Sequence, residues 1–350
     1  MTESKASKTN TYLPLIAPGL LLLFLLSTSI RPISLGYDLY NDKRILEIVT
    51  LILVNLTGLF FVDIRKRLYQ CWQSLPRIIQ IAIPSFFALG TVSALRSSYP
   101  LPALADVANH LSMLTAGLVI TSSYLLNPKQ VMRLVASGIV LLVFLSSFIE
   151  LIGFITHWAS GLQPNSHSMY IYFAHPRFFN QIQSWLLPLI FLLPLVYPKK
   201  HSLWTLSIVA AGCWWGLLFF SGGRGSSLGL LIALILSTGI WFYKNKRNSG
   251  HDFNIIFIRS LSISLALGIC LFTLLIYLPG WLGLDTSSSI ERTIGRDLST
   301  SMGRFSIWST ALTGFYENYW FGIGPGLYSC LTPADYYPAH PHNGYLQILS

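Results

Sequence analysis

The sequence LVASGIVLLVFLSSFIELIGFITH, residues 134–157, decides the fold class of this chain. A helix needs about 20 predominantly apolar residues to cross the hydrocarbon core of a bilayer, and this run is long enough. Eight further apolar runs lie at residues 13–30, 45–62, 78–95, 103–126, 184–198, 203–220, 226–243 and 260–279. The runs are continuous and Leu-rich, without the alternation of a barrel strand. We therefore predict an all-α fold, a polytopic transmembrane helical bundle of about nine helices.

The run at 184–198 differs from the others because it is short and contains two prolines. Pro188 and Pro194 each lack the backbone N–H that a helix interior needs. We expect this helix to be kinked, or to begin before Trp185.

The composition excludes a soluble globular protein. Of the 350 residues, 10% are charged and 53% are apolar, whereas soluble domains have a charged share of about 25%. The net charge is +10, from 23 Lys and Arg against 13 Asp and Glu. These cations stand in short clusters between apolar runs, which is typical of membrane topology and does not indicate a nucleic-acid partner.

The positive-inside rule places the N-terminus in the cytoplasm, because 14 of the 23 cations then lie on the inner side. The nine outer cations are eight Arg and one Lys. This bias favours recognition of phosphate or carboxylate by the guanidinium fork. We predict a membrane bundle over residues 1–279 and a large outer loop with amphipathic helices over 280–350. Because residues 345–350 are typical of the start of an element, we expect this chain to be a fragment or the product of a truncated gene, with at least one further membrane helix missing.

Ionisable side chains fall inside several of the apolar runs, toward their outer ends. They predict a polar pocket on the outer side of the membrane, since charged groups in lipid are usually functional. The alternative is that these groups sit at the interface and reach water. The residues are Glu47, Asp106, His110, Glu150 and His157.

The segment SGGRGSS, residues 221–227, predicts an anion site. It lacks the Lys-Ser/Thr ending and the preceding strand of a nucleotide P-loop. Its glycines free backbone N–H groups at the start of the next helix, where the helix dipole favours an anion, and Arg224 adds a cation. The alternative is a tight turn whose Arg contacts lipid headgroups.

The segment RFSIW, residues 304–308, opens a predicted amphipathic helix on the outer leaflet, with apolar residues spaced helically at 305, 308, 312, 315 and 319. Arg304 and Trp308 are four residues apart and therefore share a face. The alternative is an interfacial helix with one solvated Arg. The segment FGIGPG, residues 321–326, is predicted to be a turn.

The segment HPHNGYL, residues 340–346, supplies candidate proton-transfer groups. A histidine has an unperturbed pKa near 6.5, so His342 suits a general base for a sugar hydroxyl. A metal site is the less favoured interpretation, because Asp335 is the only nearby acid. The third interpretation is that the histidines lie in a surface loop.

The segment PRFFNQIQ, residues 176–183, adds a cation and amides at a helix entrance. These groups suit contact with a sugar or phosphate, or anchoring at the membrane interface.

Taken in order, these motifs resemble the O-antigen ligase/polymerase superfamily over residues 160–350. The resemblance implies a glycosyltransferase of the bacterial inner membrane, with a periplasmic active site. It implies transfer of a glycan from an undecaprenyl-pyrophosphate carrier to lipid A–core oligosaccharide. A polymerase acting on lipid-linked repeat units and a transferase acting on protein Ser or Thr are the family alternatives. We expect no cofactor, and we prefer metal-independent transfer because the outer segments contain no Asp-x-Asp motif.

The resemblance also implies roles for individual residues. Arg224 and Arg304 carry over as pyrophosphate ligands, and His342 as the base or the group that orients the acceptor. We expect six further residues to bind substrate: Arg177, Asn180, His340, Asn343, Trp308 and Tyr345. A single displacement would invert the anomeric centre. A rival hypothesis is a proton-coupled transporter or flippase that uses Asp106, His110 and Glu150 as a relay.

Overall fold

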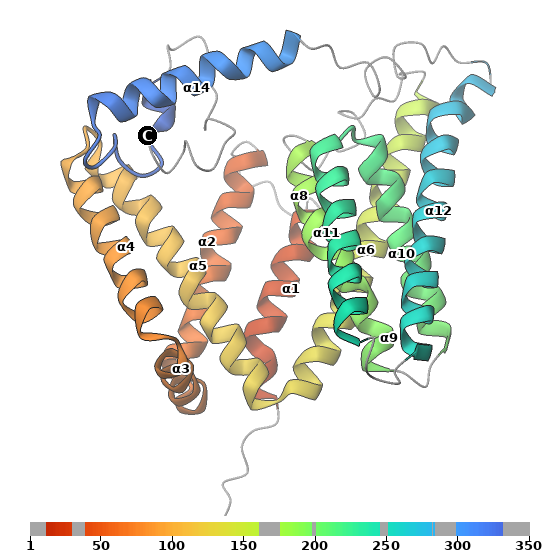
Figure 1. The fold of residues 1–350 in the computed structure, drawn as a ribbon, viewed down its shortest axis with the longest axis horizontal. Coiled ribbons are helices and arrows are strands. Elements are labelled where there is room, and N and C mark those ends of the chain that lie inside the picture. The colour runs from red at the N-terminus through yellow and green to blue at the C-terminus, as the bar shows by residue number, and fades with distance from the viewer. Residues whose placement is uncertain are drawn as a thin grey trace, which may run out of the picture. The chain divides into compact units, whose positions relative to one another are not determined.

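The structure is a computed structural model that describes residues 12–29, 39–160, 176–197, 201–245, 251–281, 283 and 299–331. Within this part of the chain all regular structure is helical (Figure 1). The predicted all-α fold is confirmed.

In chain order, the helical elements are η1 (Leu13–Leu15), α1 (Ile16–Ser29), α2 (Leu39–Phe60), α3 (Val62–Ser74), α4 (Arg77–Arg96), α5 (Pro100–Leu126), α6 (Pro128–Ala159), α8 (Pro176–Leu186), η2 (Leu187–Phe191), α9 (Leu192–Val196), α10 (His201–Phe220), α11 (Arg224–Asn245), α12 (His251–Trp281), α14 (Ser299–Glu317) and η3 (Tyr328–Leu331). Each of the nine predicted apolar runs overlaps at least one of these helices.

Six segments are long and apolar enough to cross a membrane: Arg77–Arg96, Pro100–Leu126, Pro128–Ala159, Phe179–Val196, Ser202–Phe220 and Ile256–Leu278. A bent pair, Arg44–Phe60 with Val62–Ser74, raises the number to seven if it counts as one span. Two apolar helices, Leu13–Ser27 and Gly225–Ile240, are shorter. The chain is a multi-pass membrane protein.

The predicted break in the run at 184–198 is confirmed. The helix begins at Pro176, well before Trp185, and continues as the 3-10 turn η2 at Leu187–Phe191 before α9. Pro188 lies in η2, where its missing N–H costs an α-helical hydrogen bond. The segment between the predicted runs 134–157 and 184–198 is therefore partly helical, because α6 runs to Ala159 and α8 starts at Pro176.

The helix α3 was not predicted. The segment lies between the predicted apolar runs 45–62 and 78–95 and contains Arg65-Lys66-Arg67, yet residues 62–74 form a helix at 95° to the one before it. The reason is that Ile64 and Leu68, four residues apart, share a face, and Ile64 is fully buried. Tertiary packing thus overrides the charged composition of the segment.

The chain divides into two compact units. Unit 1 comprises residues 1–17, 48–126 and 296–350, and unit 2 comprises residues 18–47 and 127–295. The predicted organisation into 1–279 and 280–350 concerns position relative to the membrane and stays a prediction.

In unit 1, α5 packs against α3 and α4, and the second half of α2 approaches α5 closely. A Cβ at Gly58 would lie 2.6 Å from a methyl carbon of Val119. The amide of Asn55 donates to the backbone carbonyl of Ser112, 3.0 Å away. Small and amide residues of this kind are usual where helices pack in lipid.

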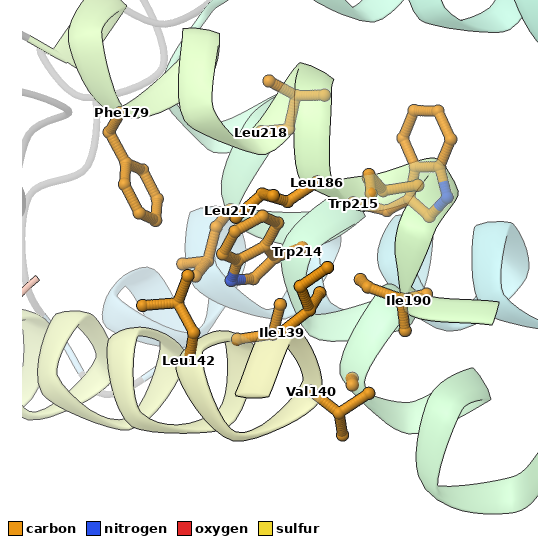
Figure 2. Packing of buried hydrophobic residues seen from close by; sticks show 14 of the residues in the cluster. Ile139, Val140, Leu142, Phe179, Leu186, Ile190, Trp214, Trp215, Leu217 and Leu218 are labelled. Atoms are coloured by element: carbon orange, nitrogen blue, oxygen red, sulfur yellow. The ribbon is translucent and has the colours of Figure 1, made fainter. Parts of the chain in front are cut away.

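In unit 2, the core is centred on Trp214 and Trp215 of α10, which are both fully buried. Figure 2 shows them among side chains of α6, α8 and η2. On another side, α10 lies along α12 at glycine contacts, where a Cβ at Gly268 would stand 3.1 Å from the backbone nitrogen of Gly216. These glycines let the two helix backbones approach, as is common in membrane bundles.

Candidate functional site

The predicted anion site in unit 2 is a tight turn between α10 and α11. The Ser221 hydroxyl donates to the carbonyl of Leu218 at 2.6 Å and accepts from the N–H of Gly223 at 3.3 Å. Gly222 has φ +67°, a backbone conformation that glycine adopts without penalty. The helix α11 then begins at Arg224, so its first N–H groups lack partners within the helix. The turn therefore supplies the helix terminus that the sequence predicted.

The amide motif of α8 contacts this turn. Asn180 is 2% exposed, and a Cβ at Gly223 would lie 3.0 Å from its Cγ and closer still to its Nδ2. The structure thus brings together two motifs that are more than 40 residues apart in the sequence. Only a glycine at position 223 leaves room for the Asn180 amide.

Buried polar atoms continue from this contact along α8. Among the described residues, Asn180 Oδ1 and Gln183 Oε1 have no hydrogen-bond partner. Gln183 is fully buried, and its Nε2 donates to the carbonyl of Trp214 at 3.2 Å. Buried amide oxygens that lack a partner are costly and indicate a place where a ligand or water can bind.

The helix α6 lines the same part of unit 2 with polar side chains. The indole of Trp214 donates to the hydroxyl of Ser146 at 3.3 Å, and the ring of Phe154 contacts that of Phe220 with centroids 5.8 Å apart. Glu150 lies one turn from Ser146 and one turn from Phe154, and it is 1% exposed. It therefore belongs to the face of α6 that packs on α10.

Sequence reasoning singled out Glu150 and Asn180, and it included Gln183 among the amides of the 176–183 motif, but it missed Ser146. The sequence could have indicated Ser146, because it lies four residues before Glu150 and therefore on the same face of α6. Gln183 follows Asn180 by three residues on α8 in the same way.

In unit 1, the segment after α14 packs against that helix and donates a hydrogen bond to it. The hydroxyl of Tyr328 donates to the carbonyl of Ile307 at 2.8 Å. A Cβ at Gly314 would lie 2.6 Å from Leu331. The packed face of α14 consists of Ile307, Ala311 and Gly314. Of the predicted apolar stripe, Phe305, Leu312 and Tyr319 are exposed, whereas Trp308 is half-buried and packs against the cluster of Ile307, Ala311 and Tyr328. Only part of the stripe therefore faces away from the packed side, and the interfacial position of α14 stays a prediction.

The predicted turn at 321–326 docks on the end of the α4–α5 pair. The hydroxyl of Ser93 donates to the carbonyl of Phe321 at 2.5 Å, and the Arg96 guanidinium lies 4.8 Å from the centre of the Phe321 ring. Gly324 has φ +113°, and a Cβ there would stand 2.7 Å from Ser97 Cβ. Glycine is therefore required at position 324, both by the positive φ and by the close approach to Ser97.

The ionisable pair on α5 lies at the same docking surface. Gly326 has φ +72°, and a Cβ there would lie 3.0 Å from Asp106 Cγ. His110 Nδ1 is 3.6 Å from Asp106 Oδ2 and 2.9 Å from the Asp106 carbonyl, because residues four apart share a helical face. His110 is exposed, with its side chain 60% accessible. Asp106 and His110 belong to unit 1, whereas Glu150, Glu47 and His157 belong to unit 2. One pocket shared by all five stays a prediction.

The structure places the remaining predicted residues as follows. Arg177 lies in the first turn of α8, Arg224 is the first residue of α11, and Arg304 and Trp308 lie in α14. The Trp308 ring is 5.6 Å from that of Phe305. The residues His340, His342, Asn343 and Tyr345 lie outside the described part of the chain. Because Arg224 belongs to unit 2 and Arg304 to unit 1, their convergence stays a prediction.

A metal site is the other interpretation of the histidine motif. Within the described residues, no three His, Cys, Asp or Glu side chains are grouped as metal ligands would be. Both motif histidines lie outside these residues, so the prediction of metal independence stays open to test.

Fold and site together define a class: a multi-pass helical membrane protein with a glycine turn and helix terminus suited to an anion. Residues 206–350 match the family described as O-antigen ligase. No curated protein and no solved structure matches the chain. The family match confirms the resemblance to the O-antigen ligase/polymerase superfamily, whose members are glycosyltransferase-like enzymes, and does not distinguish the ligase branch.

Proposed function

We propose that this chain transfers a glycan from an undecaprenyl-pyrophosphate carrier to lipid A–core oligosaccharide, on the periplasmic face of a bacterial inner membrane. The observation that carries the proposal is the packing of the α8 amide motif on the glycine turn before α11. Asn180 touches Gly223, and the next residue is the first arginine of the family motif, Arg224. A helix terminus beside a cation and an amide suits a pyrophosphate.

The reaction is a single displacement at the anomeric carbon. The acceptor oxygen forms the new bond as the bond to the pyrophosphate oxygen breaks, and the electron pair leaves with the pyrophosphate. His342 takes the proton of the acceptor hydroxyl. Because attack comes from the face opposite the leaving group, the anomeric configuration is inverted.

The two arginines supply the electrostatic part of catalysis. Negative charge grows on the bridging oxygen as the bond breaks, so Arg224 and Arg304 stabilise the transition state more than the ground state. Guanidinium groups replace the metal ion that many sugar-nucleotide transferases need. Arg177, Asn180 and Trp308, with the 340–345 motif, bind and orient the donor and acceptor glycans.

Two other family activities use the same chemistry with another acceptor. A polymerase would transfer to a lipid-linked repeat unit, and a third branch transfers to protein Ser or Thr. The transporter hypothesis has less support, because the family match covers the segment with the arginine and histidine motifs. An assay that offers all three acceptors separates the branches.

The test is glycan transfer by the purified full chain from a lipid-linked donor, with and without EDTA. We expect Arg224→Ala and Arg304→Ala each to lower kcat about ten- to hundredfold, the value of one charge-assisted contact. His342→Ala should remove the part of the rate that depends on proton transfer from the acceptor hydroxyl to the imidazole. EDTA should have no effect.

The matched control is Arg259→Ala, which removes an exposed cation from α12. It should keep the full rate. Full activity in both Arg224→Ala and Arg304→Ala, or equal losses in the control, would refute the assignment. A lipid-linked donor that moves across the membrane without being cleaved would favour the transporter instead.

A further inference from the structure

The helix α3 has a position and a charge that the proposed reaction does not use. It follows α2 directly, at a bend of 95°. The single linking residue, Phe61, is extended, with φ −96° and ψ 110°. Arg65 Nη1 donates to the carbonyl of Leu59 at 3.1 Å, which satisfies one of the carbonyls left free at the end of α2. The bend is thus a fixed feature of unit 1.

One face of α3 is packed against α5. Ile64 is fully buried, and Leu68 and Cys71 are half-buried on the same side. Cys71 Sγ lies 4.0 Å from the hydroxyl of Ser122, near the C-terminal end of α5. The helix therefore lies beside the end of a segment that is long and apolar enough to span the membrane.

The part of α3 that is not packed is open and cationic, with Arg65 and Lys66 exposed against the single acid Asp63. Arg67 borders the packed face, is half-buried and donates to Gln70 Oε1 at 3.1 Å. Arg77, also exposed, begins α4 just beyond. Within the described residues, none of these cations has an ion pair with a carboxylate. Four cations against one acid leave this segment strongly positive.

Aromatic residues accompany the cations. Tyr69 is 61% exposed, and it lies four residues after Arg65 on the same face. Trp72 is half-buried beside it. Tyr and Trp with Lys and Arg are the residues that helices place at the level of lipid headgroups.

The neighbours of α3 fix its depth. Its C-terminal end leads within three residues into α4, a candidate span, and its packed face touches the end of α5. Four charged residues within residues 62–74 are too costly for the hydrocarbon core. Figure 1 shows α3 at the end of the α4–α5 pair opposite α14. The helix therefore lies along the bilayer surface, at the end of unit 1 remote from the 321–326 turn.

We propose that α3 is an interfacial helix whose open face binds the headgroups of anionic phospholipids. Its cations meet the lipid phosphates, and Tyr69 and Trp72 lie among the headgroups. Under the predicted orientation this is the cytoplasmic leaflet, whose anionic lipids attract basic segments beside membrane helices. The site is independent of glycan transfer.

The test measures lipid preference of the full chain in detergent. The chain is titrated with palmitoyl-oleoyl phosphatidylglycerol or with the matching phosphatidylcholine, and bound lipid is counted by native mass spectrometry. The variant Lys66→Gln with Arg67→Gln keeps Arg65 and its bond to α2. We expect it to bind phosphatidylglycerol about 10- to 30-fold more weakly, because each basic residue at a surface contributes about a fivefold preference.

Two controls accompany this variant. Lys129→Gln with Arg259→Gln removes two exposed cations elsewhere and should leave binding unchanged. Lys66→Arg with Arg67→Lys keeps the charge and should bind like the original chain. Equal binding by the Gln variant and the original chain would overturn the proposal, as would equal loss in the 129/259 control. A headgroup preference that inorganic phosphate fully removes would also contradict it, since the site would then be one for free anions.

Discussion

Gly223 is the residue where the two predicted motifs of unit 2 meet. Any side chain there would enter the space of the Asn180 amide, which is itself buried. Gly225, two residues on, has nothing within 4 Å of the position its Cβ would take. The two positions thus provide a matched pair for substitution.

Gly223→Ala should lower the free energy of unfolding by about 1–3 kcal/mol, the usual cost of an added methyl group in a packed site. Gly225→Ala should leave it unchanged or raise it slightly, because the alanine reduces the freedom of the unfolded chain. Thermal unfolding in detergent measures both. If the two variants unfold at the same temperature, Asn180 does not pack on the turn as described.

Several residues of the site were predictable one at a time. The glycines with Arg224 indicated a helix terminus, and Asn180 was chosen for its place at a helix entrance. Their contact was not predictable, because it depends on how α8 and α10 pack, which residue spacing does not give. Ser146 was missed, and the burial of Gln183 was not predicted, for the same reason, since only packing shows that an amide or hydroxyl is buried.

At the level of elements, the 321–326 turn joins α14 to the α4–α5 pair. Ser93, Arg96 and Ser97 hold this turn from α4, and Tyr328 holds α14 from η3. The N-terminal helices therefore support the helix that carries Arg304. The sequence predicted the turn and the helix but contained no sign of this support.

Gly324→Ala should weaken the docking of this turn. The alanine must adopt a positive φ, which costs about 1–2 kcal/mol, and its Cβ would meet Ser97. Hydrogen exchange of residues 299–331 should become faster. Adding Ser97→Gly should restore part of the protection, because the contact is removed and the backbone strain remains. A double variant that exchanges like Gly324→Ala alone would contradict the contact with Ser97.

The boundaries of the helices show what a sequence can and cannot establish. Continuous apolar runs predicted the nine helical segments, since length and hydropathy are sufficient for that purpose. The helix α3 was not predicted from the sequence, because its apolar face is narrow and its charges dominate the composition. The two prolines of the run at 184–198 predicted a kink in this segment, but they did not predict that it takes the form of the 3-10 turn at Leu187–Phe191.

For the whole molecule, the proposed reaction requires that Arg224, Arg304 and His342 meet on one side of the bilayer. Arg224 lies in unit 2 and the other two residues in unit 1. The proposal therefore predicts that residues of both units take part in one reaction, and this prediction can be tested separately from the fold of either unit.

The most direct test of this claim is a distance measurement by pulsed electron spin resonance. Spin labels are placed at Ser226→Cys and Ser306→Cys, each two residues after an arginine, in a chain whose native cysteines are replaced. A shared site predicts a distance between the two labels well below the thickness of the hydrocarbon core, about 30 Å. The distribution of this distance should become narrower when a lipid-linked pyrophosphate is added. A distance equal to or greater than that thickness, unchanged by the lipid, would contradict a shared pyrophosphate site.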